Sequence, residues 1–293
     1  MDLFEYEFML RALAGALVIG LTAPALGIYL VQRGMSLIGD GIGHVALTGV
    51  GVGLLFQQSP VLTAVVVSIL GAVGVELVRQ RGRTSGDLAL ALLFYGGIAG
   101  GVVLVGLAGS TSANLTQFLF GSLTTTSRQD LIVIVVLGAA VLTAMLALRP
   151  ALFAVCNDEE YARVSGLPVR ALNLLLAVTT AVTVTIAMRT VGVLLVSALM
   201  VVPVAAAQQV TRGFRATMAA AMAIGVGAAA AGVWTSGELD TAPGATIVIL
   251  AIAVFVAITV GAATWRVLRR RVPDRGGAAS AEPPEVVLEA GAR

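Results

Sequence analysis

Two ionisable side chains stand at the start of an apolar stretch of this sequence. Asp40 and His44, which is the one histidine of the chain, are four residues apart and lead into the apolar run from Val45 to Phe56. On a helix, residues at this spacing share a face, with Cβ atoms about 5 to 6 Å apart. A carboxylate and a neutral imidazole at that separation can both bind one divalent cation, and they suit zinc or manganese better than copper(I), which prefers sulfur. The pair therefore predicts a metal site.

A structural role for the same pair is also open. Asp40 could cap the helix that follows it, and His44 could form a hydrogen bond with a neighbouring helix. A motif of two residues does not decide between these readings. A single chain would in any case supply two ligands, whereas zinc favours four and manganese more.

The loop between residues 152 and 172 is the second candidate. Asp158, Glu159 and Glu160 open a predicted short helix, residues 158–164, because acidic side chains complement a helix N-terminus. The sequence Gly166-Leu167-Pro168 is expected to end that helix. We predict a short cytoplasmic helix along the membrane surface, which is either a solvated connection or a docking piece for a cytoplasmic partner.

A third stretch runs from Val191 to Pro203. Pro203 removes a backbone hydrogen bond, and we expect it to kink the helix that contains it. Glu76, Asn173 and Gln208 are polar residues near the ends of apolar runs, and we attribute them to the membrane interface.

The elements that position these residues are membrane helices. Of 293 residues, 58% are hydrophobic and only 12% are charged, which is too apolar for a soluble domain of this length. The apolar runs approach the roughly 20 residues that one helical crossing needs, whereas a membrane β-barrel would show alternating segments of about ten. We predict an all-α, polytopic membrane helical bundle of eight or nine spans, at residues 8–31, 37–56, 60–78, 88–108, 130–148, 170–188, 191–209, 216–234 and 244–266.

The arginines predict the orientation of these spans. All basic residues are arginine, and they gather after the third, seventh and ninth spans, which the positive-inside rule places in the cytoplasm. The N-terminus is then outside and the C-terminus inside. Residues 110–128, with the half-apolar core 115–121, are too short to cross and predict a re-entrant or surface helix on the outer side, or an ordinary outer loop. The positive charge reflects topology, so we expect lipid contacts and no nucleic-acid binding.

We expect one transmembrane domain, residues 1–271, followed by a disordered cytoplasmic tail, residues 272–293. Cys156 is the single cysteine, and we give it no role. The sequence contains no phosphate-binding Gly-x4-Gly-Lys-Ser/Thr loop and no His-Glu-x2-His motif. It therefore predicts neither a nucleotide hydrolase nor a membrane protease, and no enzyme.

Taken together, the three stretches resemble the permease subunits of bacterial zinc and manganese ABC importers, the metal-importer (ABC-3) family. That family shows a Gly-Asp-Ala-Leu-Ser-His type motif in span two, a cytoplasmic Asp-x3-Ala-x3-Gly loop and a Val-Gly-x-Leu-Leu-Val-x-Ala-Leu-x3-Pro span. In this sequence they correspond to residues 39–44, to Asp158 with Ala162 and Gly166, and to residues 191–203. Gly41 and Gly43 replace the usual Ala and Ser, and Thr48 stands where Pro is common.

The resemblance implies a BtuC-like ABC importer permease in the bacterial plasma membrane. It implies a homodimer or heterodimer of permeases, a cytoplasmic ABC ATPase dimer and an extracellular metal-binding protein that delivers the ion. By the same resemblance, residues 158–166 would form the coupling helix that docks on the ATPase. Asp40 and His44 would coordinate Zn²⁺ or Mn²⁺ in transit, with no cofactor bound permanently.

Other cargoes and mechanisms stay open at this point. A permease for a metal chelate or vitamin would not need a close carboxylate and imidazole pair. A proton-coupled secondary metal transporter could use Asp40 and His44 as a proton relay. Between the two free ions we favour zinc over manganese.

Overall fold

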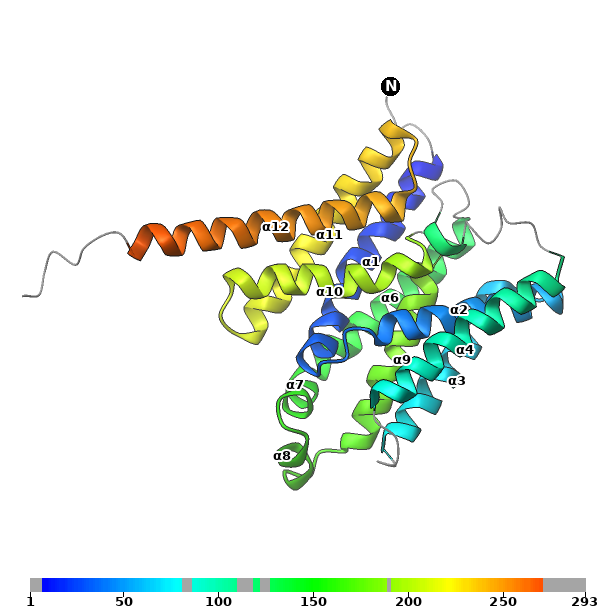
Figure 1. Ribbon diagram of the computed structural model, residues 1–293, viewed down its shortest axis with the longest axis horizontal. Helices are drawn as coiled ribbons and strands as arrows, with labels where there is room; N and C mark the ends of the chain where they lie inside the picture. Colours follow the sequence, from blue (N-terminus) through cyan, green and yellow to red (C-terminus); the bar gives the residue numbers. More distant parts are fainter. Residues whose placement is uncertain (1–6, 81–85, 110–117, 122–126, 189–190, 271–293) are drawn as a thin grey trace, which may run out of the picture.

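The computed structural model describes residues 7–80, 86–109, 118–121, 127–188 and 191–270, and the labelled elements in these ranges are all helices (Figure 1). The helices are α1 (Glu7–Gln32), α2 (Ile38–Leu55), α3 (Pro60–Gln80), α4 (Gly86–Leu107), α6 (Arg128–Ala147), α7 (Arg149–Asn157), α8 (Glu159–Val164), α9 (Val169–Ala187), α10 (Val193–Val210), α11 (Phe214–Leu239) and α12 (Pro243–Arg270).

The apolar runs fold as the sequence predicts. In the part of the chain that the structure describes, eight helices are long and apolar enough to cross a membrane, and α10 contains a shorter apolar segment, Leu195–Val210. The prediction of an all-α membrane bundle with eight or nine spans is confirmed. The tight hairpin expected at residues 189–190 and the tail at residues 272–293 lie outside the described residues.

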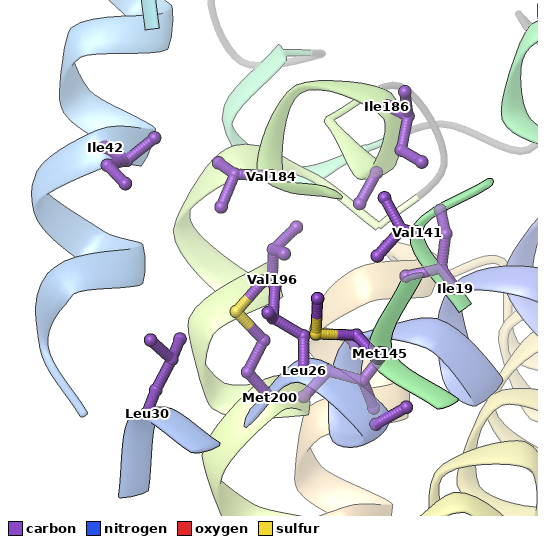
Figure 2. Close-up of a cluster of buried hydrophobic side chains, with 14 of the residues drawn as sticks. Ile19, Leu26, Leu30, Ile42, Val141, Met145, Val184, Ile186, Val196 and Met200 are labelled. Atoms are coloured by element: carbon purple, nitrogen blue, oxygen red, sulfur yellow. The ribbon is translucent and has the colours of Figure 1, made fainter. Parts of the chain in front are cut away.

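The spans divide into inner and outer helices. In α1, α2 and α9 about two thirds or more of the apolar window is buried, at 72%, 72% and 67%, whereas in α3, α4, α6 and α12 the share is 22% or less. The inner helices therefore make the protein core, and the outer helices offer most of their surface to lipid. Figure 2 shows the centre of this core, where Leu26 of α1, Met145 of α6 and Met200 of α10 meet.

Small residues allow the inner helices to approach closely, as is common in membrane bundles. Helix α1 packs on α11 where Gly20 faces Gly225, so that a Cβ at either position would overlap the opposite backbone. Pro24 lies inside α1 in the same contact, and its ring would meet a Cβ at Gly225.

Six arginines of the described residues line two cavities of the bundle. Arg79, Arg163 and Arg170, from α3, α8 and α9, line one cavity of about 650 Å³, and Arg33 bonds to Glu159 in its wall. Arg149 lines a second cavity with Arg212 and Arg215. Arg11 and Arg128 lie instead near the starts of α1 and α6, and the orientation of the bundle in the membrane stays a prediction.

Part of the segment between α4 and α6 is described. Residues 118–120 are helical, and the Leu119–Gly121 backbone lies so close to Gly192 that a Cβ there would overlap it. Phe118 and Leu119 are half-buried against the core. These residues therefore pack against the bundle, and the remainder of the predicted re-entrant or surface helix lies outside the described ranges.

Candidate metal site and coupling loop

Asp40 lies in the first turn of α2 and points to α10. Its carboxylate Oδ1 accepts a hydrogen bond from the hydroxyl of Ser197, which is buried. The N-cap residue of α2 is Leu37, and no side chain caps the helix. Asp40 is therefore oriented by a neighbouring span, and it does not act as the helix cap that the sequence left open.

His44 lies one turn further along α2 and is 8% exposed. Its ring meets Phe94 of α4 edge to face, with ring centroids 4.3 Å apart. Its Nδ1 is buried and has no hydrogen-bond partner among the described residues. Because an unpaired buried polar atom costs about 1 to 3 kcal/mol, this nitrogen has the character of a ligand atom without its ligand.

Close packing by α4 places the imidazole. A Cβ on Gly97 of α4 would overlap the backbone of His44 and Val45, so glycine is needed for this approach. Thr48, one turn beyond His44, donates a hydrogen bond of 2.7 Å to the Gly97 carbonyl. Thr48, which stands where the family commonly has Pro, thus connects α2 to α4.

The other departures leave α2 regular. Gly41 faces Leu90 and Leu93 of α4, and a Cβ there would lie 3.0 Å from a Leu90 methyl group. Gly43 faces Val193 of α10, whose carbonyl oxygen would lie 3.2 Å from an added Cβ. Helix α2 nevertheless continues from Ile38 to Leu55 without interruption.

The donor set on one chain is small. No group of three or more His, Cys, Asp or Glu residues that could hold a metal ion occurs in the part of the chain that the structure describes. A cation at Asp40 and His44 would need further ligands from water or from a second copy of this surface. Weak, incomplete coordination is what a transported ion requires, since it must leave the site as readily as it enters.

The second candidate forms the predicted short helix, α8. Asp158 is its N-cap, and its carboxylate accepts a hydrogen bond of 2.9 Å from the Tyr161 N–H. Ala162 is fully buried and anchors α8 to the bundle. Gly166 has φ +81°, and the Gly166 N–H and Leu167 N–H bond back to the carbonyls of Arg163 and Ala162 at 3.1 Å, which forms a Schellman ending.

The three defining residues of the Asp-x3-Ala-x3-Gly motif, Asp158, Ala162 and Gly166, therefore stabilise the start, the packing and the end of α8. The residues that face outward are others: Tyr161 is 67% exposed, Val164 is 89% exposed, and Glu160 is exposed beside them. Docking piece and solvated connection both stay open for α8.

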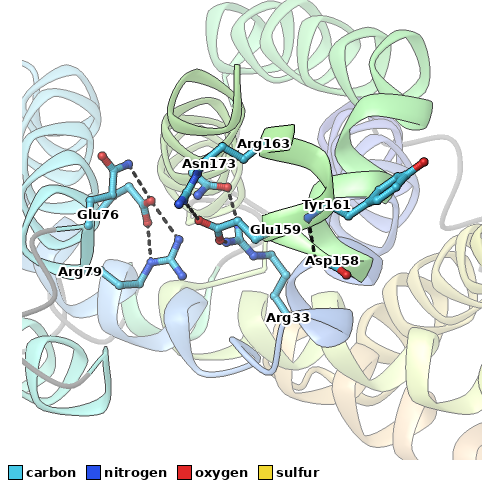
Figure 3. A network of polar contacts seen from close by, with 9 residues as sticks. Arg33, Glu76, Arg79, Asp158, Glu159, Tyr161, Arg163 and Asn173 are labelled. Carbon is cyan, nitrogen blue, oxygen red and sulfur yellow. Dashed lines mark hydrogen bonds and ion pairs between the residues drawn. The ribbon is translucent and has the colours of Figure 1, made fainter. Parts of the chain in front are cut away.

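A buried polar network joins this loop to the bundle (Figure 3). Arg33, in the turn between α1 and α2, donates to Asn173 Oδ1 at 2.6 Å and to Glu159 Oε2 at 3.0 Å. Burial, followed by the charge of Arg79, lowers the pKa of the Arg33 guanidinium. Glu76 and Asn173 lie near span ends, as predicted, but both are at most 3% exposed, so their partners are in the protein; Glu76 pairs with Arg79 at 2.9 Å.

Sequence reasoning missed Ser197 and Arg33 as contributors to the two sites. Ser197 lies in the third motif, where no partner was predicted for it, and Arg33 was not singled out. The one available signal was an arginine directly before the Asp40 motif. Ser197 and Asp40 are separated by 157 positions in the sequence, and Arg33 and Glu159 by 126.

Two further expectations concern single residues. Burial raises the pKa of Cys156 to about 11, so its reactive thiolate is suppressed. Pro203 lies inside α10, which is one continuous helix on both sides of it. The predicted kink stays a prediction.

Comparisons with known proteins agree with this architecture. The model of the ABC 3 transport family matches residues 5–262. A manganese transport system membrane protein of Halalkalibacterium halodurans is 32% identical over 87% of this chain and 87% of its own. A high-affinity zinc uptake system membrane protein of Haemophilus influenzae is 29% identical, covering 86% of this chain and 96% of its own.

A third relative, a chelated iron transport system membrane protein of Yersinia pestis, is 32% identical over 86% of this chain and 85% of its own. Among solved structures, PsaBC from Streptococcus pneumoniae in complex with Fab superimposes with a TM-score of 0.80 and 29% identity, covering 92% of this chain and 96% of that one. The relatives share the architecture and differ in the metal that their names state.

Proposed function

Because this chain belongs to the ABC 3 transport family of metal ABC importer permeases, we propose that it passes a divalent transition metal ion into the cytoplasm along a path that includes Asp40 and His44. The observation that carries this proposal is the buried His44 Nδ1 without a partner, one helical turn from an oriented carboxylate. Oxygen and imidazole donors of this kind suit zinc and manganese.

The cargo we favour is zinc, with manganese next. Among the relatives, four are named for manganese and one for zinc, and carboxylate and imidazole suit both ions, so the preference for zinc rests on neither and needs the measurement given below. A second copy of the permease, identical or related, would supply another Asp40 and His44 pair, and water would complete the coordination shell. An external metal-binding protein would deliver the ion.

Energy would enter through α8. We propose that the exposed face of α8 docks on a separate cytoplasmic ATPase dimer, with Asp158, Ala162 and Gly166 holding the helix in shape and Glu160 lying on the docking face. In this proposal the two arginine-lined cavities face the cytoplasm, the N-terminus is outside and the C-terminus is inside.

The test is metal uptake by cells deprived of their own zinc or manganese importers. We expect Asp40→Ala and His44→Ala each to abolish uptake while the ATPase still co-purifies with the permease. Glu238→Ala, a change of an exposed acid at the end of α11, serves as the matched control and keeps normal uptake. Normal uptake by both site variants would sink the assignment.

The choice of metal needs a separate measurement. Metal analysis of the purified external protein, together with growth rescue of a deletion strain by zinc or by manganese, identifies the cargo. The named chelated-iron relative keeps a metal chelate as the second candidate. Unchanged chelate uptake in the Asp40 variant, with no uptake of free ion by the parent, would favour it. Family membership favours ATP-driven import over the proton-coupled alternative.

A further inference from the structure

Arg33 connects the two candidate sites. It lies in the turn that ends α1 and precedes α2, and its side chain is only 7% exposed. One nitrogen of the guanidinium donates to Asn173 of α9 at 2.6 Å, and another donates to Glu159 of α8 at 3.0 Å (Figure 3). A buried guanidinium needs such partners, and its planar fork fixes where they lie.

The chain between Arg33 and Asp40 contains little slack. The Gly34 N–H bonds to the Val31 carbonyl at 3.1 Å, and the Met35 N–H bonds to the Leu30 carbonyl at 2.9 Å. The Ile38 N–H then bonds to the Met35 carbonyl at 3.1 Å, which leads directly into the first turn of α2. The turn that carries Arg33 is therefore joined by hydrogen bonds both to α1 and to the first turn of α2.

Glu159 of α8, the partner of Arg33, lies beside a cavity. The Arg33 side chain is 7% exposed, whereas the Glu159 side chain is 37% exposed and lines the cavity of about 650 Å³. Arg163 of α8 also donates to Glu159, at 3.2 Å, and Arg79 of α3 faces the same cavity while paired with Glu76. The cavity therefore leaves space beside Glu159.

We propose that Arg33 is a positioning residue that transmits the movement of α8 to α2, so that displacement of the docking helix repositions Asp40 and His44. The role of α8 as the docking helix and of α2 as part of the path rests on the proposed function above. The link itself rests on the buried contacts of Arg33 with Glu159 and Asn173.

The first experiment measures metal uptake per ATP hydrolysed in proteoliposomes that hold the complete transporter and the metal-loaded external protein. We expect Arg33→Gln and Glu159→Gln each to keep the ATPase bound and hydrolysing ATP, with uptake per ATP reduced about tenfold. The double variant should lose no more than the worse single variant, because both break one link. Glu238→Gln, a change of an exposed acid at the end of α11 and outside both candidate sites, is the matched control and should leave the ratio unchanged.

Three outcomes would overturn the proposal: an unchanged ratio in Arg33→Gln, an equal loss in Glu238→Gln, or a double variant whose loss is the product of the single losses. Arg33→Lys keeps the charge without the fork, and we expect it to restore the ratio only in part. If Arg33→Gln does not fold, Glu159→Gln decides, since Glu159 lies at the open edge of the network.

A second readout does not depend on the cargo. Spin labels at Leu37, before α2, and at Ser165, after α8, in a Cys156→Ser background report nucleotide-dependent distance changes in the complete transporter. We expect Arg33→Gln to alter this change, whereas Asp40→Ala should abolish uptake and leave the change intact. Normal uptake in Asp40→Ala would count against the metal path alone, and an unaltered distance change in Arg33→Gln would count against the link alone.

Discussion

Removing the hydroxyl of Ser197 should weaken metal binding without removing a ligand. Among the described residues, Ser197 is the hydrogen-bond partner of the Asp40 carboxylate, and it holds that group toward α10. Outer partners of a metal ligand typically change affinity by about 10- to 100-fold. This range corresponds to about 1.4 to 2.8 kcal/mol, and a hydrogen bond to a charged group contributes about 1.5 to 3 kcal/mol. The two scales agree, so we expect Ser197→Ala to lower the affinity of the permease for zinc within that range.

The chain offers a matched control. Ser68 of α3 is fully buried, and its hydroxyl has no hydrogen-bond partner among the described residues. Ser68→Ala makes the same chemical change in a membrane helix and breaks no hydrogen bond, so we expect zinc affinity to be unchanged. Because an unsatisfied hydroxyl is lost, the thermal midpoint should stay equal or rise slightly.

The assay is equilibrium dialysis of radioactive zinc and manganese against purified permease in lipid nanodiscs, with Asp40→Ala as the reference for a lost ligand. Wild-type affinity in Ser197→Ala, beside a clear loss in Asp40→Ala, would refute the orienting role of Ser197. An equal loss of metal affinity in Ser197→Ala and Ser68→Ala would mean that the loss comes from a general disturbance of the fold. Unchanged metal affinity in Asp40→Ala would show that Asp40 is not a metal ligand.

Three further changes test other parts of the structure. Gly166→Val forces a β-branched residue to φ +81°, which costs about 1 to 2 kcal/mol, so ATPase docking measured by co-purification and metal-stimulated ATP hydrolysis should fall, and Gly166→Asn should be affected less. Unchanged metal-stimulated ATPase activity in the valine variant would contradict this role. Gly27→Ala places a Cβ onto the Met200 backbone and should lower stability by about 1 to 3 kcal/mol in a thermal melt in detergent, whereas Gly74→Ala, with no atom within 4 Å of the new Cβ, should not. Equal melting of these two variants would count against the close approach of α1 and α10. Cys156 has its pKa raised to about 11, so its alkylation by maleimide should be slow at neutral pH and accelerate as the pH rises toward that value; fast labelling at neutral pH would show that the thiol is not buried as described.

The spans were predictable because the membrane imposes a length and a composition on each of them. Helices α1 and α2 begin and end within a residue or two of the predicted ranges, since Arg33 and Gln57 mark the loops that follow them. The short helix α8 was predictable for another reason: Asp158 and Gly166 are local signals, and they act within one turn of where they stand.

Partners across helices were not predictable from one sequence. Apolar spans look alike, so no local signal pairs Ser197 with Asp40 or Arg33 with Glu159. Asn173 looked like an interface residue because it stands near the start of a span, and only packing of α9 against the α1–α2 turn buries it. Tertiary contact decided each of these cases.

The division into inner and outer helices has a consequence for how this protein can diverge over generations. On α3, α6 and α12 most side chains are exposed at the surface of the single chain, where one branched aliphatic residue replaces another with little penalty. On α1 and α2, positions such as Gly27 and Gly49 meet neighbouring backbone directly and admit no larger residue. A saturation mutagenesis library selected for growth on limiting metal should therefore drift freely around the rim of the bundle and stay nearly fixed along its centre. The rim can then adapt to membranes of different lipid composition while the ion path is left untouched.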